Sequence, residues 1–199
     1  MTQRERIAAG LLYEEMGEGM PADRARAKDL AFDFNHTRPS DKETRDSIAR
    51  ELFGRLGESY FFEGPLYASY GYNVSWGEGV YANFNLMLVD DYTITIGNRV
   101  LIGPNVIICT SGHPLDPDVR NEGRQFSLPI VIEDDVWIGG GVVINPGVTI
   151  GRGSVIGAGS VVTKDIPAGV VAVGSPCRML RELGDEDKIY FRAGVKVTD

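Results

Sequence analysis

Two histidines are the residues of this chain best suited to proton transfer. Imidazole, with an unperturbed pKa of about 6.5, can take a proton from a hydroxyl at neutral pH. His113 lies in residues 110–117, which are too rich in Pro, Gly and Asp to form a strand. His36 follows Asn35 in a segment with helical character. We therefore interpret His113 as a general base carried on a loop, and His36 as a structural residue.

Cysteine usage favours neither a zinc site nor a disulfide. Cys109 and Cys177 are far apart, and neither has a second Cys two or three residues away. Ser111 is close to His113, but no Ser or Cys is placed by a motif to act as a covalent nucleophile. The pattern predicts a reduced, cytoplasmic protein without a metal site.

Composition limits the partners. The 199 residues suit one domain with a small appendage. Lys and Arg number 20 against 28 Asp and Glu, and a net charge of −8 argues against nucleic-acid binding. Apolar stretches are short and interrupted, and the charged start leads into no long apolar run, so neither a membrane span nor a secretory signal is expected.

The elements that must position these residues begin with a helical segment, predicted for residues 1–59. Pro21 suits a first helical position, and Ser40 with Glu43 has the form of a capping box. Two apolar stripes follow helical spacing and need a partner surface. Their residues are Ala27, Leu30, Ala31 and Phe34, then Ile48, Leu52 and Leu56.

A six-residue period replaces the helical one beyond residue 60. Aliphatic residues recur at every sixth position, the fourth residue after most of them is small or branched, and Gly often follows directly. The first set is Ile96, Ile102, Ile108, Ile132, Ile138, Ile144, Ile150, Ile156 and Val162. The second is Val100, Val106, Val136, Val142, Val148, Ser154 and Ser160.

Such a period matches neither a helix nor an alternating strand. It predicts a short strand followed by a corner, three of which close a triangular coil whose stacked aliphatics fill a narrow prism. Between Thr93 and Ile189 the only aromatic residues are Phe126 and Trp137. We expect both to lie outside the prism, because its interior is too thin for rings.

The period is interrupted twice. Val74, Val80 and Leu86 also step by six, but the phase slips by four before Ile96. The pattern also vanishes between Cys109 and Pro129, which predicts a loop extruded from the prism at residues 109–129. The β-domain is predicted to span residues 60–183, with a tail at 184–199.

Several motifs carry a family resemblance. They are Asn35-His36, Tyr81-Ala82-Asn83-Phe84-Asn85, Ser111-Gly112-His113-Pro114, Val136-Trp137-Ile138-Gly139-Gly140, Ile144-Asn145-Pro146-Gly147 and Val161-Val162-Thr163-Lys164-Asp165. Together with the hexads they resemble the hexapeptide-repeat sugar O-acetyltransferases, closest to the galactoside and maltose enzymes, over nearly the whole chain. The resemblance implies a mainly β fold, a left-handed parallel β-helix, assembled as a homotrimer with acetyl-CoA sites between neighbouring prisms.

The resemblance also implies acceptor contacts around His113, the expected base for attack of a sugar hydroxyl on acetyl-CoA. Asn83 would bond acceptor or cofactor, while Asp91 would hold an acceptor hydroxyl. Tyr81, Ser69 and Glu15, the last replacing a family Asp, are further expected contacts. For Asn83, Asp91, Tyr81 and Ser69, a corner, turn or packing role is the alternative.

Cofactor contacts follow the same way. The residues implied to hold acetyl-CoA are Asn83, Trp137, Gly140, Ala158, Thr163, Lys164, Arg178 and Arg181. Gly-rich corners would admit the pantetheine arm, and the basic residues would meet phosphates. The alternatives are a solvated charged face for the basic residues and subunit packing for Trp137. Gly140 replaces a Ser common in galactoside enzymes, so only backbone contact is expected there.

Three other functions are compatible with a β-helix fold. A γ-class carbonic anhydrase shares the β-helix but needs three His ligands, and this chain has two. A β-helix acetyltransferase acting on a non-sugar or amino-sugar acceptor stays open, as does a non-catalytic scaffold. The acceptor itself, of galactoside, maltose or glucose type, is not fixed by the sequence.

Overall fold

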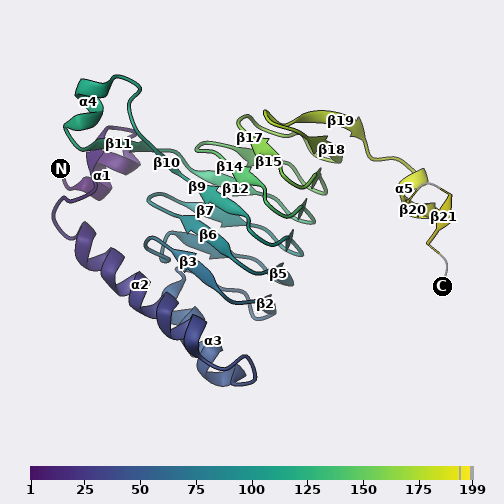
Figure 1. The fold of residues 1–199 in the computed structure, drawn as a ribbon, viewed down its shortest axis with the longest axis horizontal. Coiled ribbons are helices and arrows are strands. Elements are labelled where there is room, and N and C mark those ends of the chain that lie inside the picture. The colour runs from purple at the N-terminus through teal and green to yellow at the C-terminus, as the bar shows by residue number, and fades with distance from the viewer. Residues whose placement is uncertain (193, 198–199) are drawn as a thin grey trace.

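Parallel strands stacked in three sheets form a solenoid in the computed structural model, which describes residues 1–192 and 194–197 (Figure 1). The first sheet contains β4 (Val74–Trp76), β7 (Ile94–Ile96), β12 (Ile130–Ile132) and β15 (Thr149–Ile150). The second contains β2 (Tyr60–Phe62), β5 (Val80–Ala82), β8 (Leu101–Ile102), β13 (Trp137–Ile138), β16 (Val155–Ile156) and β18 (Val170–Val173), with β19 (Arg178–Glu182) antiparallel at its end. The third contains β3 (Leu66–Ala68), β6 (Leu86–Val89), β9 (Ile107–Cys109), β14 (Val143–Ile144) and β17 (Val161–Val162).

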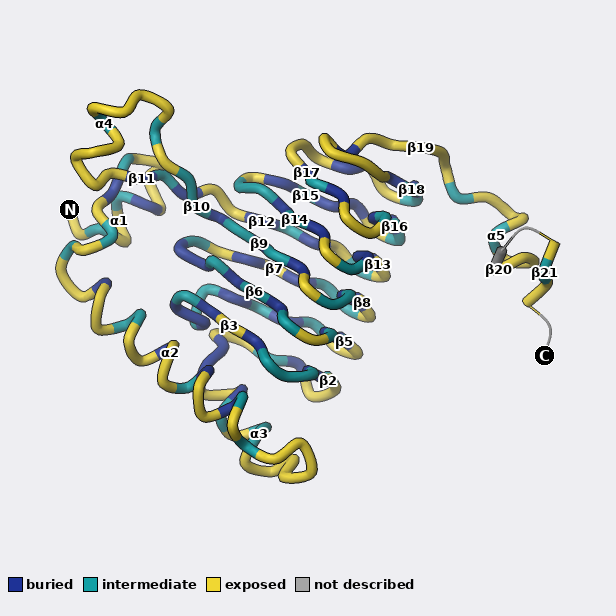
Figure 2. Tube along the Cα trace, in the orientation of Figure 1, coloured by how far each residue is buried: buried dark blue, intermediate teal, exposed yellow. Residues whose placement is uncertain are grey.

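The hexads become ladders of aliphatic side chains inside the solenoid. Ile138 of β13 pairs with Ile102 of the coil before and Ile156 of the coil after. These side chains are at most 1% exposed, and every coil buries its inward residues against the next. The predicted parallel β-helix of hexapeptide repeats is confirmed. Figure 2 shows the buried positions running along the strands, with exposed corners between them.

The predicted phase slip is wrong in size. Val74 pairs with Ile94 and Trp76 with Ile96, so Val74 belongs to the second inward position and Trp76 to the first. In that frame Leu88 and Ile96 occupy the same inward position of successive strands and are eight residues apart. The phase therefore slips by two residues and not by four. The pattern was misleading because the clear aliphatic run of the early coils lies at the second inward position, whereas the first carries residues of mixed type. The run is Val74, Val80 and Leu86, and the first position carries Trp76, Ala82 and Leu88.

Aromatic rings enter the interior of the solenoid at its first coils. Trp76 is 1% exposed and packs edge-on against Phe53, with ring centroids 5.3 Å apart, and against Phe62 at 4.7 Å. Further along, Trp137 lies outside the prism and is 54% exposed, and Phe126 lies on the extruded loop. The expectation that both late rings avoid the interior is confirmed.

Three helices precede the solenoid: α1 (Gln3–Ala8), α2 (Met20–His36) and α3 (Lys42–Leu52). Helix α2 runs along β3 (Figure 1). The N-cap of α3 is Asp41, whose carboxylate accepts from the Thr44 N–H at 3.1 Å. The predicted capping box at Ser40 and Glu43 is therefore wrong, because an acidic cap one residue later takes that role.

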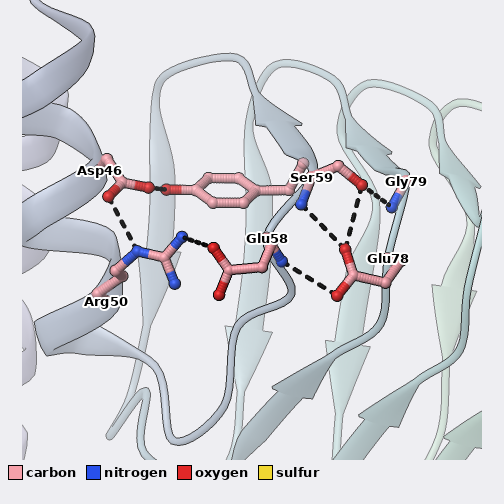
Figure 3. A network of polar contacts seen from close by, with 7 residues as sticks. Asp46, Arg50, Glu58, Ser59, Glu78 and Gly79 are labelled. Carbon is pink, nitrogen blue, oxygen red and sulfur yellow. Dashed lines mark hydrogen bonds and ion pairs between the residues drawn. The ribbon is translucent and has the colours of Figure 1, made fainter.

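A polar network attaches α3 to the first two coils (Figure 3). The Tyr60 hydroxyl donates to Asp46 at 2.6 Å, and Arg50 donates to the same carboxylate at 2.9 Å. These bonds, that of Tyr60 first, hold the pKa of Asp46 below its usual value. Arg50 also pairs with Glu58, whose backbone N–H donates to Glu78 on the next coil. The helical appendage is thus linked to the solenoid through side chains as well as through its apolar stripes.

The extruded loop has secondary structure of its own. It carries β10 (Ser111–Gly112), α4 (Pro117–Asn121) and β11 (Arg124–Ser127). The short strand β1 (Tyr13–Glu14), from between α1 and α2, pairs antiparallel with β11, giving a three-stranded sheet in the order β1-β11-β10. The N-terminal segment is therefore fixed to the loop that carries His113.

The C-terminal residues turn away from the solenoid. They form α5 (Glu186–Ile189), β20 (Tyr190–Arg192) and β21 (Val195–Lys196), which lie beyond β19 and apart from the coils (Figures 1 and 2). Residues 193, 198 and 199 of the predicted tail lie outside the described residues.

Candidate active site

One corner of the solenoid carries the residues expected to do chemistry. At this corner each coil passes from the third sheet to the first, from β3 to β4, from β6 to β7 and from β9 to β12. Ser69 comes directly after β3, Asp91 comes two residues after β6, and His113 lies on the loop that leaves β9. Because successive coils stack, residues from three turns of the chain meet along one edge.

A pocket of about 350 Å³ lies at this corner. Its lining includes four of the predicted residues, one each from the N-terminal segment, two corners and the extruded loop. The lining residues are Glu15, Arg24, Lys28, Ser69, Val89, Asp91, Ser111, His113 and Gln125.

One ring nitrogen of His113 is engaged in a hydrogen bond to the backbone. Its Nδ1 lies 3.2 Å from the backbone oxygen of Arg124, and a carbonyl oxygen can only accept. The proton of the neutral imidazole is therefore on Nδ1, and Nε2 carries the lone pair. His113 is exposed to solvent in the pocket, so Nε2 is available to take a proton from a ligand.

Asp91 faces the pocket from a buried position, with 6% of its surface exposed. Its Oδ2 accepts from the Tyr13 hydroxyl at 2.6 Å and from Gln125 Nε2 at 3.2 Å. Burial, followed by the bond to Asp91, raises the pKa of Tyr13 far above its usual value, so this hydroxyl stays a donor. Sequence reasoning missed Tyr13 and Gln125.

Two cations beside Glu15 were also missed. Arg24 forms an ion pair with Glu15 and donates to the Tyr70 hydroxyl at 2.8 Å, while its guanidinium lies over the Tyr70 ring. Lys28 follows Arg24 by four residues on α2, so both lie on one helix face and both line the pocket. That helical spacing could have identified the pair from the sequence.

The remaining predicted acceptor residues lie elsewhere on the chain. Tyr81 and Asn83 line a second groove, of about 460 Å³, over the outer face of the second sheet, together with Trp137, Gly140 and Ala158 from the cofactor prediction. Asn83 Oδ1 accepts from the Phe84 N–H at 2.8 Å, as a corner Asn would. Within one chain, this groove and the His113 pocket are separate surfaces.

Glycines keep the floor of the groove close to the backbone of the next coil. A Cβ on Gly103 would lie 2.6 Å from the Gly140 nitrogen, and one on Gly139 would lie 2.6 Å from the Ala158 nitrogen. Larger residues would push the coils apart, so these positions need glycine. The result is a bare strip of backbone beside the Trp137 ring.

The other predicted cofactor residues lie outside the groove lining. Thr163 and Lys164 are exposed just after β17, and Lys164 has no ion pair within residues 1–192 and 194–197. Arg178 donates to the carbonyl of Cys177 at 2.7 Å. Arg181 makes two bonds of 2.7 Å to Asp187, which lower the pKa of Asp187 to about 2. Arg181 is thus engaged by the C-terminal segment.

His36 lies in a third cleft, of about 860 Å³, between α2 and the third sheet. Its Nδ1 is 2.8 Å from the Phe32 oxygen one helical turn earlier, and the two rings stack at 3.9 Å. These contacts within the helix suit the structural interpretation of His36. The cleft meets the His113 pocket at Lys28, Ser69 and Val89.

Asp90 is a buried carboxyl beside the pocket. It is 0% exposed, and its Oδ1 accepts from the Tyr70 N–H at 2.9 Å, while Oδ2 has no hydrogen-bond partner among the described residues. Burial raises the pKa of Asp90 to about 7. Asp90 therefore ties two corners together and titrates close to neutral pH.

Asp90→Asn is expected to gain stability relative to the natural chain as the pH rises from about 4 to about 7, with the difference levelling off above that. Because the folded pKa exceeds the unfolded value, the stabilisation from the protonated group is complete below about 4 and is lost as the pH rises through about 7. Asn imitates the protonated acid and does not titrate. Melting temperatures across this range test the point, and a difference between the two proteins that stays constant with pH would contradict it.

Among residues 1–192 and 194–197, no cluster of three or more His, Cys, Asp or Glu side chains is arranged to hold a metal ion. None of the helices in this part of the chain is both long enough and apolar enough to cross a membrane.

Comparison with known proteins reveals two family matches. Residues 6–57 match the maltose acetyltransferase hexapeptide capping motif, and residues 129–164 match the bacterial transferase hexapeptide model of six repeats. Galactoside O-acetyltransferase of Escherichia coli (strain K12) is 54% identical over 197 residues, covering 99% of this chain and 97% of its own length.

Solved structures agree. A galactoside acetyltransferase in complex with coenzyme A has a TM-score of 0.97 and 53% identity, with 100% of both chains covered. A maltose O-acetyltransferase from Clostridium difficile 630 has a TM-score of 0.91 and 44% identity over 93% of this chain and 99% of its own. The resemblance predicted from the motifs is confirmed, and the chain belongs to the hexapeptide-repeat sugar O-acetyltransferase family of the galactoside and maltose enzymes.

Proposed function

We propose that this protein transfers the acetyl group of acetyl-CoA to a hydroxyl of a small sugar, of galactoside, maltose or glucose type. The observation that carries the proposal is the corner pocket, where an imidazole with an unprotonated Nε2 stands beside acidic and hydroxyl side chains that can hold sugar hydroxyls. Membership of the family and the coenzyme A complex of a relative support the choice of donor.

In the proposed mechanism, Nε2 of His113 takes the proton of the sugar hydroxyl as its oxygen attacks the thioester carbonyl. The tetrahedral intermediate collapses, the carbon–sulfur bond breaks, and the thiolate of CoA leaves. The imidazolium of His113 returns its proton to that thiolate. Asp91, Ser69 and Glu15 hold other hydroxyls, so that one oxygen is presented to Nε2.

Transfer is proposed to be direct, in a ternary complex. The nearest thiol, Cys109, is half-buried and donates to the backbone oxygen of Ser111 at 3.2 Å, which points it away from a nucleophilic role. Two unpaired cysteines also fit the proposed cytoplasmic location.

A homotrimer is proposed to complete the site. Asn83 and Tyr81 lie in the groove of the second sheet, away from His113 of the same chain, so a neighbouring copy would have to bring the two surfaces together. Large apolar side chains surround that groove and favour burial against another subunit. They are Phe61, Phe84, Leu101 and Trp137, exposed by 53%, 50%, 48% and 54%. The groove would then take the pantetheine arm, with Gly140 and Ala158 on its floor and Thr163, Lys164, Arg178 and Arg181 toward the phosphates.

Product analysis tests the proposed reaction. Acetyl-CoA and a methyl galactoside are incubated with the protein, free thiol is measured, and the sugar product is examined by mass spectrometry and NMR. The expected result is one acetyl ester on a sugar oxygen for each CoA released. Release of CoA without any acetylated sugar would contradict the proposal.

A further inference from the structure

The three-stranded sheet β1-β11-β10 contacts both the imidazole of His113 and the carboxylate of Asp91 in the corner pocket. From β11, the oxygen of Arg124 accepts from His113 Nδ1, and the next residue, Gln125, donates to Asp91. In the pairing of β1 with β11, Tyr13 is the partner of Gln125. The imidazole of His113 and the carboxylate of Asp91 are therefore both hydrogen-bonded to the short strand β11, and pairing with β1 holds that strand in place.

Tyr13 makes the shortest recorded contact to Asp91. Its ring is 1% exposed, and its hydroxyl donates to Asp91 Oδ2 at 2.6 Å. Since a phenol has one hydrogen, the 2.9 Å contact to Ser127 Oγ must be a bond that Ser127 donates to Tyr13. The order of donation runs from Ser127 to Tyr13 to Asp91. Ser127 and Tyr13 are buried and do not line the pocket, whereas Asp91 does.

This order leaves the two oxygens of Asp91 unequal. Within the described residues, both hydrogen bonds recorded for the carboxylate fall on Oδ2, from Tyr13 and from Gln125. Oδ1 is the oxygen left to accept from a ligand in the pocket. Without the Tyr13 bond the carboxylate is freer to rotate about its χ2 angle, so the accepting oxygen is no longer held at one position in the pocket.

We propose that Tyr13 is a positioning residue for the acceptor. It fixes the rotation of the Asp91 carboxylate about χ2, and therefore the position and direction from which the free oxygen accepts an acceptor hydroxyl. That position sets which hydroxyl faces Nε2 of His113. Tyr13 acts only through Asp91 and touches neither substrate. The inference rests on the proposed function, since it concerns the acceptor of that reaction.

Tyr13→Phe is the direct variant, because it removes one oxygen and keeps the ring. Loss of a buried bond to a charged group is expected to lower kcat/KM for the sugar about 10- to 100-fold. KM for acetyl-CoA is expected to stay unchanged, since the predicted cofactor groove is a separate surface. Tyr72→Phe is the matched control. Tyr72 packs against the apolar cluster that contains Tyr13 (Ile7, Tyr13, Met20 and Tyr70), and its hydroxyl donates to Asp23 rather than to Asp91.

A double-mutant cycle separates positioning from general damage. In an Asp91→Asn background, Tyr13→Phe is expected to have little further effect on the sugar kcat/KM, because the group it positions is already altered. Acceptors lacking single hydroxyls give a second readout. The natural chain should discriminate strongly at one hydroxyl, and Tyr13→Phe should weaken discrimination at that hydroxyl.

The outcomes are distinct. An unchanged sugar kcat/KM in Tyr13→Phe, or an equal loss with and without Asp91→Asn, overturns the positioning role while the proposed reaction stands. An equal rise in KM for acetyl-CoA overturns it as well. A natural chain that acetylates no sugar overturns the proposed function and, with it, the role of Tyr13 toward a sugar.

Discussion

His113→Ala is expected to lower kcat by roughly 10²- to 10⁴-fold at neutral pH, the range typical for loss of a general base. An alcohol is barely ionised at this pH, so attack on the thioester needs a group to take its proton. His113 offers Nε2 for that purpose because its Nδ1 proton is bound by the Arg124 oxygen. Steady-state turnover of a sugar acceptor with saturating acetyl-CoA measures the effect.

Binding measurements separate chemistry from folding in this variant. Coenzyme A affinity, measured by calorimetry, should stay within a few-fold of the natural value, because the second-sheet groove does not contain His113. His36→Ala is the control for removal of an imidazole, since His36 lies in a different cleft. An His113→Ala variant that keeps most of its turnover would eliminate His113 as the base.

Ile96→Ala is expected to lower the free energy of unfolding by about 2–5 kcal/mol. Ile96 is 2% exposed in the ladder between Trp76 and Ile132, and the stacked coils cannot collapse around a cavity without disturbing their backbone pairing. The control is Thr95→Ala, which changes the neighbouring residue of the same strand, whose side chain lies on the exposed outer face. That control should cost less than about 1 kcal/mol.

Urea unfolding at one fixed protein concentration compares the two variants, since an oligomer would make the result depend on concentration. Similar losses for Ile96→Ala and Thr95→Ala would mean that the six-residue period does not mark the core.

The sequence allowed the solenoid to be predicted because one physical rule repeats along it. Every third strand returns to the same face, so Ile138 must stack on its equivalents in the neighbouring coils, Ile102 and Ile156. The frame of the early coils could not be predicted in the same way. There Val74 and Trp76 both point inward, and only the backbone pairing shows which one continues the ladder of Ile96.

Part of the corner site could be predicted. His113 stood out as an imidazole on an extruded loop, and Ser69, Asp91 and Glu15 were expected from the family resemblance. Stacking explains why Ser69, Asp91 and His113 meet, because they follow strands of one sheet. Tyr13 and Gln125 meet through pairing of β1 with β11, two short strands far apart in the sequence and without any periodicity. The bond between Arg181 and Asp187 likewise depends on the fold of the C-terminal segment, which no repeat specifies.

The central claim is that the chain acetylates a sugar hydroxyl, and a comparison of acceptors tests it most directly. Thiol release from acetyl-CoA would be followed with galactosides, glucose, maltose, amino sugars and serine, with His113→Ala run beside the natural chain. We predict that the highest kcat/KM is found with a galactoside, glucose or maltose. His113→Ala is predicted to abolish most of the turnover of that sugar. Highest activity on an amino group or on serine, or no activity on any sugar, would contradict the account.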